Sequence, residues 1–331
     1  MHNAGKFILR QLLRSVSLLV AVCICSFLLI SSSPIDPIDA YIGTESSISD
    51  EQRQAIIEYW GLDKAPIERL GIWAKNVFLH GDLGESIAYK EPVARVISKR
   101  FKTSLALMAT TWILSGIIGF ILGVLTGVFK ESLFDRIVKG FCLVMASTPA
   151  FWIGILVIML FVVKLGWFPL GMSVPLGVLS EDVTFWDRIY HLILPALTLS
   201  VTSISSLTLH TREKVVDVMS GEMVLYAKSR GETRKQIISR HLIRNIALPA
   251  ITIQFGSFSE LFGGSLLAEQ IFSYPGLGSA TVRAATKGDI PLLLALAMFS
   301  ALFVFMGNML ANILYGVLDP RIREGEEVRN G

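Results

Sequence analysis

Six long stretches with almost no charged residue set the strongest constraint on how this chain can fold. They cover residues 15–32, 103–129, 140–163, 192–209, 245–268 and 290–318, and Glu260 alone interrupts the fifth. A helix needs roughly 18 to 20 apolar residues to cross a hydrocarbon core, and a helix satisfies its own backbone hydrogen bonds there. Only 17% of the residues are charged, whereas a soluble domain carries about 25%. The sequence therefore predicts an all-α integral membrane protein with six transmembrane helices.

The first stretch also fits a secretory signal peptide, because basic residues precede it and small residues follow it. No small-x-small cleavage site comes after Ser33, however. We therefore expect the first stretch to remain as a transmembrane helix.

Basic residues predict the orientation in the membrane. They gather before the first stretch, after the second, after the fourth and after the sixth, at Lys6, Arg10, Arg14, Lys130, Arg136, Lys139, Arg212, Lys214, Lys228, Arg230, Arg234, Lys235, Arg240, Arg244, Arg321, Arg323 and Arg329. All four groups fall on one side of a six-helix topology, and short basic segments stay in the cytoplasm. Both termini are thus expected to be cytoplasmic. The net charge of +3 reflects this orientation and does not suggest nucleic-acid binding.

The predicted helices divide the chain into four parts. These are a cytoplasmic N-terminus with the first helix (1–32), an extracytoplasmic segment (33–102), a five-helix core (103–318) and a cytoplasmic tail (319–331). The core includes a long cytoplasmic segment at residues 211–245, called the basic loop below. In the second helix, Gly119, Gly123 and Gly127 form a small-residue stripe at helical spacing, which predicts close approach of another helix.

Motifs for self-contained chemistry are absent from the sequence. The chain has no G-x-x-x-x-G-K-[ST] phosphate loop, no H-E-x-x-H, no C-x-x-C and no G-x-S-x-G, and its five histidines are scattered. We therefore expect no catalytic residue, no metal site and no cofactor in this chain. Its role is expected to be transport, or the anchoring of a transport partner.

The basic loop alternates charged and apolar residues at helical spacing, and Gly231 divides it. A glycine there allows two short helices to turn sharply against each other. Such a helix pair has two explanations from its residues alone. It either lies on anionic lipid or docks into a groove on a partner protein.

A family resemblance favours the docking explanation. The segment Tyr226–Gly231 reads YAKSRG, and it is followed by RHLIRN at Arg240–Asn245 and by Leu248-Pro249. This pattern resembles the EAA loop of bacterial ABC-importer permeases, in particular their peptide/nickel branch. Five further segments resemble the same branch in the same order: GDLGESI (81–87), STPAFWIGIL (147–156), HLILPALTLS (191–200), IFSYPGLGSA (271–280) and LDPRIR (318–323). The chain departs from the commonest loop pattern at Ser229, where alanine is usual, and at Glu232, where leucine is usual.

The resemblance implies a type I importer permease in the bacterial inner membrane. Its expected partners are a second permease subunit, P-loop ATPase subunits that bind the ATP and Mg²⁺, and an extracytoplasmic substrate-binding protein. The basic loop would then couple the ATPase to the permease, which implies such a role for Tyr226, Ala227, Ser229, Arg230, Gly231, Arg240, Asn245 and Pro249. In particular, Gly231 would set the bend, Ala227 and Ser229 would permit close approach, and Arg230 would pair with acids on the partner.

Two further groups of residues are candidates for the transport path. Gln254, Ser257 and Glu260 are spaced three apart, so they share one helix face, and an acid inside a predicted span normally faces a cavity or another subunit. They are expected to line the path and attract a cation or an amine, or else to pair across a subunit interface. Pro275, Gly276 and Gly278 form either an extracytoplasmic gate or simply a tight turn.

The substrate is not determined by the sequence. The SELFGG and SRG segments resemble nickel-type permeases more than dipeptide permeases, which favours nickel or a metal chelate slightly over short peptides. Two other functions remain open at this point: a stand-alone carrier or channel, and a membrane scaffold whose loop binds a signalling partner.

Overall fold

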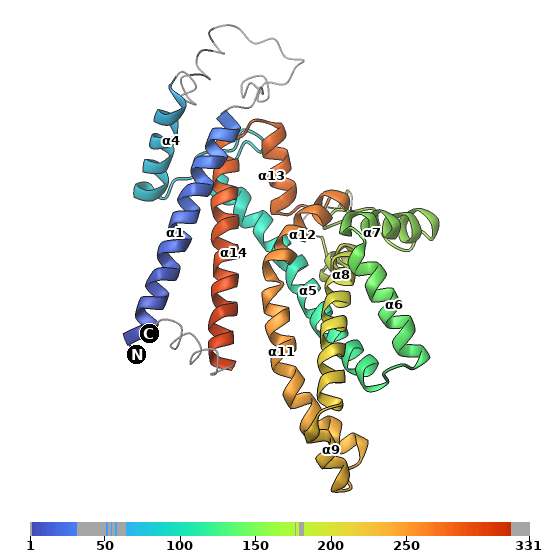
Figure 1. Ribbon diagram of the computed structural model, residues 1–331. Coiled ribbons are helices and arrows are strands. Elements are labelled where there is room, and N and C mark those ends of the chain that lie inside the picture. The colour runs from blue at the N-terminus through green and yellow to red at the C-terminus, as the bar shows by residue number, and fades with distance from the viewer. Residues whose placement is uncertain are drawn as a thin grey trace. The chain divides into compact units, whose positions relative to one another are not determined.

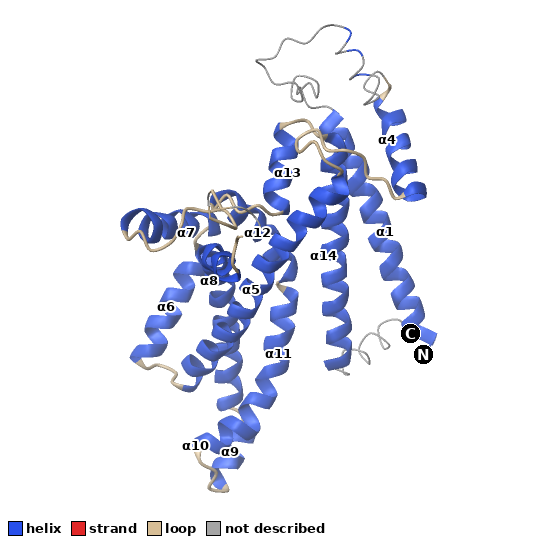
Figure 2. Cartoon of the chain, turned by 180° about the vertical axis from the view of Figure 1, so that it is seen from behind, coloured by secondary structure: helices blue, strands red, loops and turns tan. Residues whose placement is uncertain are grey.

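The computed structural model describes residues 2–31, 51, 54, 57, 64–175, 177, 178 and 182–318. Every regular element within these residues is a helix (Figures 1 and 2). The chain divides into two compact units, one of residues 1–104 with 275–305 and one of residues 105–274 with 306–331. The predicted all-α class is confirmed for the described part of the chain.

Three described helices are long and apolar enough to cross a membrane. They are α5 (Val93–Val128), α8 (Phe185–Met219) and α14 (Ile290–Leu318), in which the candidate span is Ile290–Ala311. A bent helix pair makes a fourth if it counts as one span. In α1 (His2–Ser31), Val16–Leu29 is a shorter apolar stretch. The described residues therefore support a protein that spans the membrane several times, without reaching the predicted count of six.

The predicted third span is bent in the structure. Helix α6 (Leu133–Ser147) is followed by α7 (Ala150–Val157) and the π-helical turn η2 (Ile158–Lys164). The chain bends by 109° between α6 and the segment Ala150–Lys164. Thr148 between them has an extended backbone, with ψ at 130°. The ring of the following Pro149 disfavours the helical conformation at this position. The bend therefore has a local cause in the sequence.

The predicted fifth span is also divided. Residues 245–268 fall on α11 (Ile243–Gly256) and α12 (Phe258–Ile271), which break at Ser257. Each helix has 14 residues, or about 21 Å at 1.5 Å per residue. Neither helix alone matches a hydrocarbon core of about 30 Å.

The glycine stripe of α5 packs against α8, as predicted. A Cβ atom added at Gly123 would lie 2.5 Å from the Cβ atom of Thr211, and one added at Gly127 would lie 2.5 Å from the Cβ atom of Val215. At Gly119 the nearest atom is the Leu207 Cβ at 3.0 Å. The Thr208 hydroxyl donates to the Gly119 carbonyl at 3.3 Å. The two helices therefore approach closely because α5 lacks side chains along this line.

In the first unit, α1, α4 (Pro66–Lys75) and α14 share a small core. Phe27, Ile290 and Leu294 are buried there, and Leu70 and Trp73 pack against them. Helix α4 continues into the π-helical turn η1 (Asn76–His80), and α13 (Leu277–Thr286) precedes α14.

A buried carboxylate holds the turn that follows η1 in this unit. Asp289 accepts hydrogen bonds from the Ser86 hydroxyl at 2.6 Å, the Ala88 amide at 2.9 Å and the Leu292 amide at 3.1 Å. The side chain is fully buried, and this burial raises the pKa of the Asp289 carboxyl above its usual value. The GDLGESI segment is thereby tied to the start of α14.

Candidate functional site

The basic loop begins inside α8 and then forms a helical hairpin. Helix α9 (Glu222–Ser229) is followed by Arg230 and by Gly231, whose φ of +80° is left-handed. The Gly231 amide donates to the Lys228 carbonyl at 2.9 Å, and the Glu232 amide donates to the Ala227 carbonyl at 3.1 Å. These two bonds form a Schellman motif, which favours glycine at this position. The predicted bend at Gly231 is confirmed.

Helix α9 has one buried face and one exposed face. Val224 and Ala227 are buried in a small cluster with Ile237. Leu225 and Tyr226, in contrast, are exposed to 69% and 65%. Ala227 therefore permits close approach within the hairpin itself and is covered there. The surface offered by this helix carries Leu225 and Tyr226 instead.

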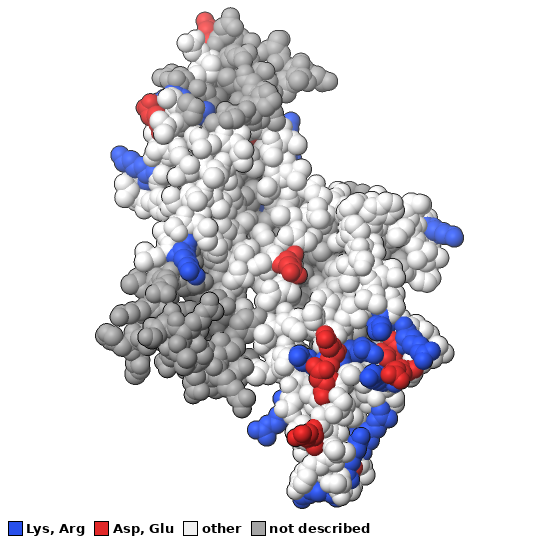
Figure 3. All heavy atoms as spheres, in the orientation of Figure 1, with Lys and Arg blue, Asp and Glu red and all other residues white. Residues whose placement is uncertain are grey.

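The two polar residues at the end of α9 are exposed and bond locally. The Ser229 hydroxyl donates to the Tyr226 carbonyl at 2.7 Å. The Arg230 guanidinium carbon lies 5.8 Å from the centre of the Tyr226 ring, which is within the range of a cation–π contact. Figure 1 places α9 at one end of the second unit, and Figure 3 shows acidic and basic side chains gathered at that end.

The segment of the hairpin that returns toward the membrane helices is fastened to the end of α5. Helix α10 (Arg234–Ile237) begins with a capping box between Thr233 and Gln236. Arg234 donates to the Val128 carbonyl, and its guanidinium carbon lies 4.9 Å from the Phe129 ring centre. The hairpin is thus held to α5 by contacts of Arg234 that do not involve α9.

The remaining predicted loop residues lie along the path into α11. The π-helical turn η3 (Ile238–Leu242) contains the exposed Arg240, and Asn245 donates to the His241 carbonyl at 2.7 Å. His241 contacts the Glu232 carboxylate at 3.0 Å, which links the end of the bend to η3. Pro249 lies inside α11. Asn245 also reaches α9, where its side-chain amide donates to the Met223 sulfur at 3.8 Å.

A buried ion pair joins α6 to α8 next to the hairpin. Arg212 donates to both carboxylate oxygens of Asp135, at 2.5 and 2.7 Å. The Asp135 side chain is 3% exposed and the Arg212 side chain 17%. The Glu131 amide also donates to this carboxylate at 2.8 Å. Sequence reasoning missed this pair, because 77 residues separate its partners and each alone looks like a surface charge.

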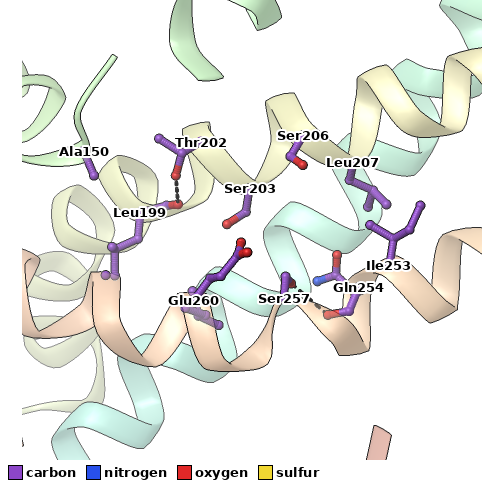
Figure 4. Close-up of a pocket in the computed structure, with 12 residues that line it drawn as sticks. Ala150, Leu199, Thr202, Ser203, Ser206, Leu207, Ile253, Gln254, Ser257 and Glu260 are labelled. Carbon is purple, nitrogen blue, oxygen red and sulfur yellow. Dashed lines mark hydrogen bonds between the residues drawn. The ribbon is translucent and has the colours of Figure 1, made fainter. Parts of the chain in front are cut away.

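The predicted polar stripe on α11 and α12 divides between packing and a cavity. Gln254 is buried, and its amide donates to the Trp112 carbonyl at 2.8 Å and the Ser115 hydroxyl at 3.1 Å. The Ser257 hydroxyl donates to the Gln254 carbonyl at 2.9 Å. Glu260 is exposed and points into a cavity of about 130 Å³ (Figure 4). Gln254 thus fastens α11 to α5, and Glu260 is the acid that reaches the open space.

Three hydroxyl residues on α8 line the opposite wall of this cavity. Thr202, Ser203 and Ser206 lie across from Glu260 (Figure 4). Sequence reasoning missed them, although the SVTSISS segment at residues 200–206 was a visible signal of a polar face. It also missed Glu269, which is fully buried on α12, because Glu269 lies just past the uncharged stretch.

The candidate gate residues are largely covered. Gly276 and Gly278 are buried and Pro275 is half-buried. Gly276 caps the start of α13, where the Leu277 amide donates to the Ser104 hydroxyl at 2.8 Å. The backbone of Gly276 is extended there, and both the gate and the tight turn stay predictions.

Comparison with known proteins matches the chain to one family over most of its length. Residues 119–324 match the family described as "Binding-protein-dependent transport system inner membrane component". The oligopeptide transport system permease protein AppB of Bacillus subtilis is 35% identical over 96% of this chain and 98% of its own length. The dipeptide transport system permease protein DppB of Escherichia coli is 30% identical over the same shares.

A solved structure agrees with the fold. A chain from an inward-facing structure of the MetNI methionine ABC transporter superposes with a TM-score of 0.56, covering 68% of this chain and 97% of its own. Its sequence identity is 13%, so this likeness concerns the fold alone. The family match and the two permeases, which align along almost the whole chain, are the stronger findings. The chain belongs to the family of binding-protein-dependent transport system inner membrane components.

Proposed function

We propose that this chain is a permease subunit of an ATP-driven importer of short peptides. It forms half of the translocation path, and a second permease subunit forms the other half. Both termini lie in the cytoplasm, six helices cross the membrane, and residues 33–102 form the extracytoplasmic segment. The wide match to peptide permeases supports this assignment.

The observation that carries the proposal is the two-sided helix α9. Its inner face is buried against α10, while Leu225 and Tyr226 on its outer face stay exposed. A short helix whose outer face carries an exposed leucine and tyrosine suits a groove on a partner better than bulk water. The hairpin is also fastened to α5 through Arg234, so a force at α9 is passed on to the long helices as a rigid-body motion.

The partner at α9 is proposed to be a P-loop ATPase that binds the ATP and Mg²⁺. An extracytoplasmic binding protein is proposed to deliver the cargo. Arg230 lies over the Tyr226 ring at the tip, where it is available to acids on the ATPase.

Peptides are favoured over nickel as the cargo. The relatives compared above are named for oligopeptides and dipeptides, and the slight preference for nickel drawn from the SELFGG and SRG segments gains no support from them.

The test is co-purification in mild detergent with the products of neighbouring genes. Wild type should retain a P-loop ATPase, and Tyr226→Ala and Arg230→Glu should each weaken its retention at least several-fold. Lys214→Glu is the matched charge-reversal control, because Lys214 is also exposed but lies on α8. Failure of wild type to retain an ATPase, or equal loss in the control, would overturn the proposal.

Cargo is tested separately in cells by uptake of labelled tri-alanine and of ⁶³Ni²⁺. Loss of tri-alanine uptake on deletion of the gene, with nickel uptake unchanged, is the expected result. The reverse pattern would overturn the peptide assignment.

A further inference from the structure

The cavity beside Glu260 holds polar groups that the protein leaves unused. Within the described part of the chain, the Glu260 carboxylate forms no ion pair or hydrogen bond, and neither do the hydroxyls of Ser203 and Ser206. All three line the same space, and Ser203 points toward Glu260 across it (Figure 4). The Thr202 hydroxyl, in contrast, donates to the Leu199 carbonyl at 3.2 Å.

A carboxylate among apolar helices is costly unless something compensates its charge. No basic residue is among those that line this cavity, and four of them are large and apolar: Leu199, Leu207, Ile253 and Leu261. No residue that lines the cavity therefore offsets the charge, and the exposed Glu260 carboxylate is open to water or to a cation that enters the cavity. A cavity of about 130 Å³ has room for a small charged group, because one water needs only about 10–15 Å³ measured in the same way.

We propose that this cavity is a transient binding site for a primary ammonium group of the cargo, with Glu260 as its counter-ion. The proposal rests on the importer function proposed above and names the part of the peptide that the path recognises. An ammonium group carries three N–H donors and no acceptor. The Glu260 carboxylate and the hydroxyl oxygens of Ser203 and Ser206 are three acceptors that face one space.

Other ligand classes fit these walls less well. An anion would meet the Glu260 carboxylate with no cation among the residues that line the cavity. A calcium ion takes six to eight oxygen ligands, whereas one carboxylate and a few hydroxyls are present. The apolar walls suit the carbon atoms next to an amine.

The test measures the electrostatic preference of the cavity in the complete transporter. Ser203→Cys is introduced into a chain whose own Cys23, Cys25 and Cys142 are replaced by alanine. Its reaction rate is measured in membranes with two methanethiosulfonate reagents, the cationic 2-aminoethyl and the anionic 2-sulfonatoethyl derivative. Each rate is divided by that of a free thiol in solution. We expect the cation to react about tenfold faster than the anion, since a charge a few ångströms away has at least this effect.

The decisive variant is Glu260→Gln, which keeps the shape and removes the charge. The preference for the cation should fall to nearly equal rates. Ser220→Cys is the matched control, because Ser220 caps the far end of α8 outside the cavity and its rates should not respond to Glu260→Gln. An unchanged preference in Glu260→Gln would overturn the proposal. Failure of Ser203→Cys to react with either reagent would also overturn it, because the cavity would then be closed in the assembled transporter.

A protection experiment identifies the source of the ammonium group. Slower labelling of Ser203→Cys by tri-alanine, but not by N-acetyl-tri-alanine, would assign the peptide N-terminus. Slower labelling by an N-acetylated lysine peptide would assign the lysine side chain, and protection by neither amine would overturn the site. Loss of ATPase co-purification, in contrast, would refute the importer without altering these rates, so the two proposals fail separately.

Discussion

A methyl group added at Gly123 tests how closely α5 packs against α8. In Gly123→Ala the new Cβ atom would lie 2.5 Å from the Thr211 Cβ atom and 2.9 Å from the Thr208 carbonyl oxygen. Two carbon atoms pack at about 3.5–4.0 Å, so the helices must separate by about 1 Å or more. Overpacking of this kind costs about 1–3 kcal/mol, and the higher helix propensity of alanine returns up to about 1 kcal/mol. We expect a net loss of about 1–2 kcal/mol.

The other glycines form a graded series of controls. Gly127→Ala meets Val215 at 2.5 Å and should cost as much as Gly123→Ala. Gly119→Ala meets Leu207 at 3.0 Å and should be close to neutral. Gly140→Ala, within α6, has no atom within 4 Å of its new Cβ and should stabilise by up to about 1 kcal/mol.

The assay is unfolding by SDS titration in mixed micelles, followed by the fluorescence of the six tryptophans. The order of stability should be Gly140→Ala, wild type with Gly119→Ala, and then the other two variants. Equal effects at Gly140 and Gly123 would show that lost backbone flexibility, and not helix contact, governs the series. That result would refute the close packing of α5 against α8.

Two further predictions concern buried carboxylates. Arg212→Met should destabilise the protein by about 3–5 kcal/mol, because it leaves the buried Asp135 charge without its partner. In the same titration, the double variant Asp135→Asn with Arg212→Met should lose less stability than the sum of the two single variants. Additive losses would contradict a direct pair. The raised pKa of Asp289 means that the folded state favours its protonated form, so its contribution to stability is complete below the ordinary aspartate pKa of about 3.9 and is lost as pH rises through the folded value. The melting-temperature advantage of wild type over Asp289→Asn should therefore shrink from about pH 4 to neutral pH, and a growing advantage would reverse the sign of this reasoning.

Several features of this protein follow from the sequence alone because they depend on local chemistry. The uncharged stretches identify a membrane protein, since the transfer of apolar residues into lipid depends little on their neighbours. The stripe at Gly119, Gly123 and Gly127 predicts a helix contact, because a close approach of two helices requires positions without a side chain. Gly231 predicts a bend, because a left-handed backbone favours a residue without a side chain. The order of short motifs along the chain was enough to suggest the family.

Other features were decided only by the tertiary structure. Hydropathy measures the free energy of moving a residue from water into lipid, and this value is the same for a straight helix and a bent one. The 109° bend within residues 133–164 and the break at Ser257 therefore leave no trace in the hydropathy of these apolar stretches. The burial of Ala227 depends on the rotation of α9 against α10. The Asp135–Arg212 pair likewise requires partners whose pairing no local pattern encodes. The cavity beside Glu260 exists because α8 and α12 turn Ser203 and Glu260 toward one space, and this rotation is set by packing around whole helices.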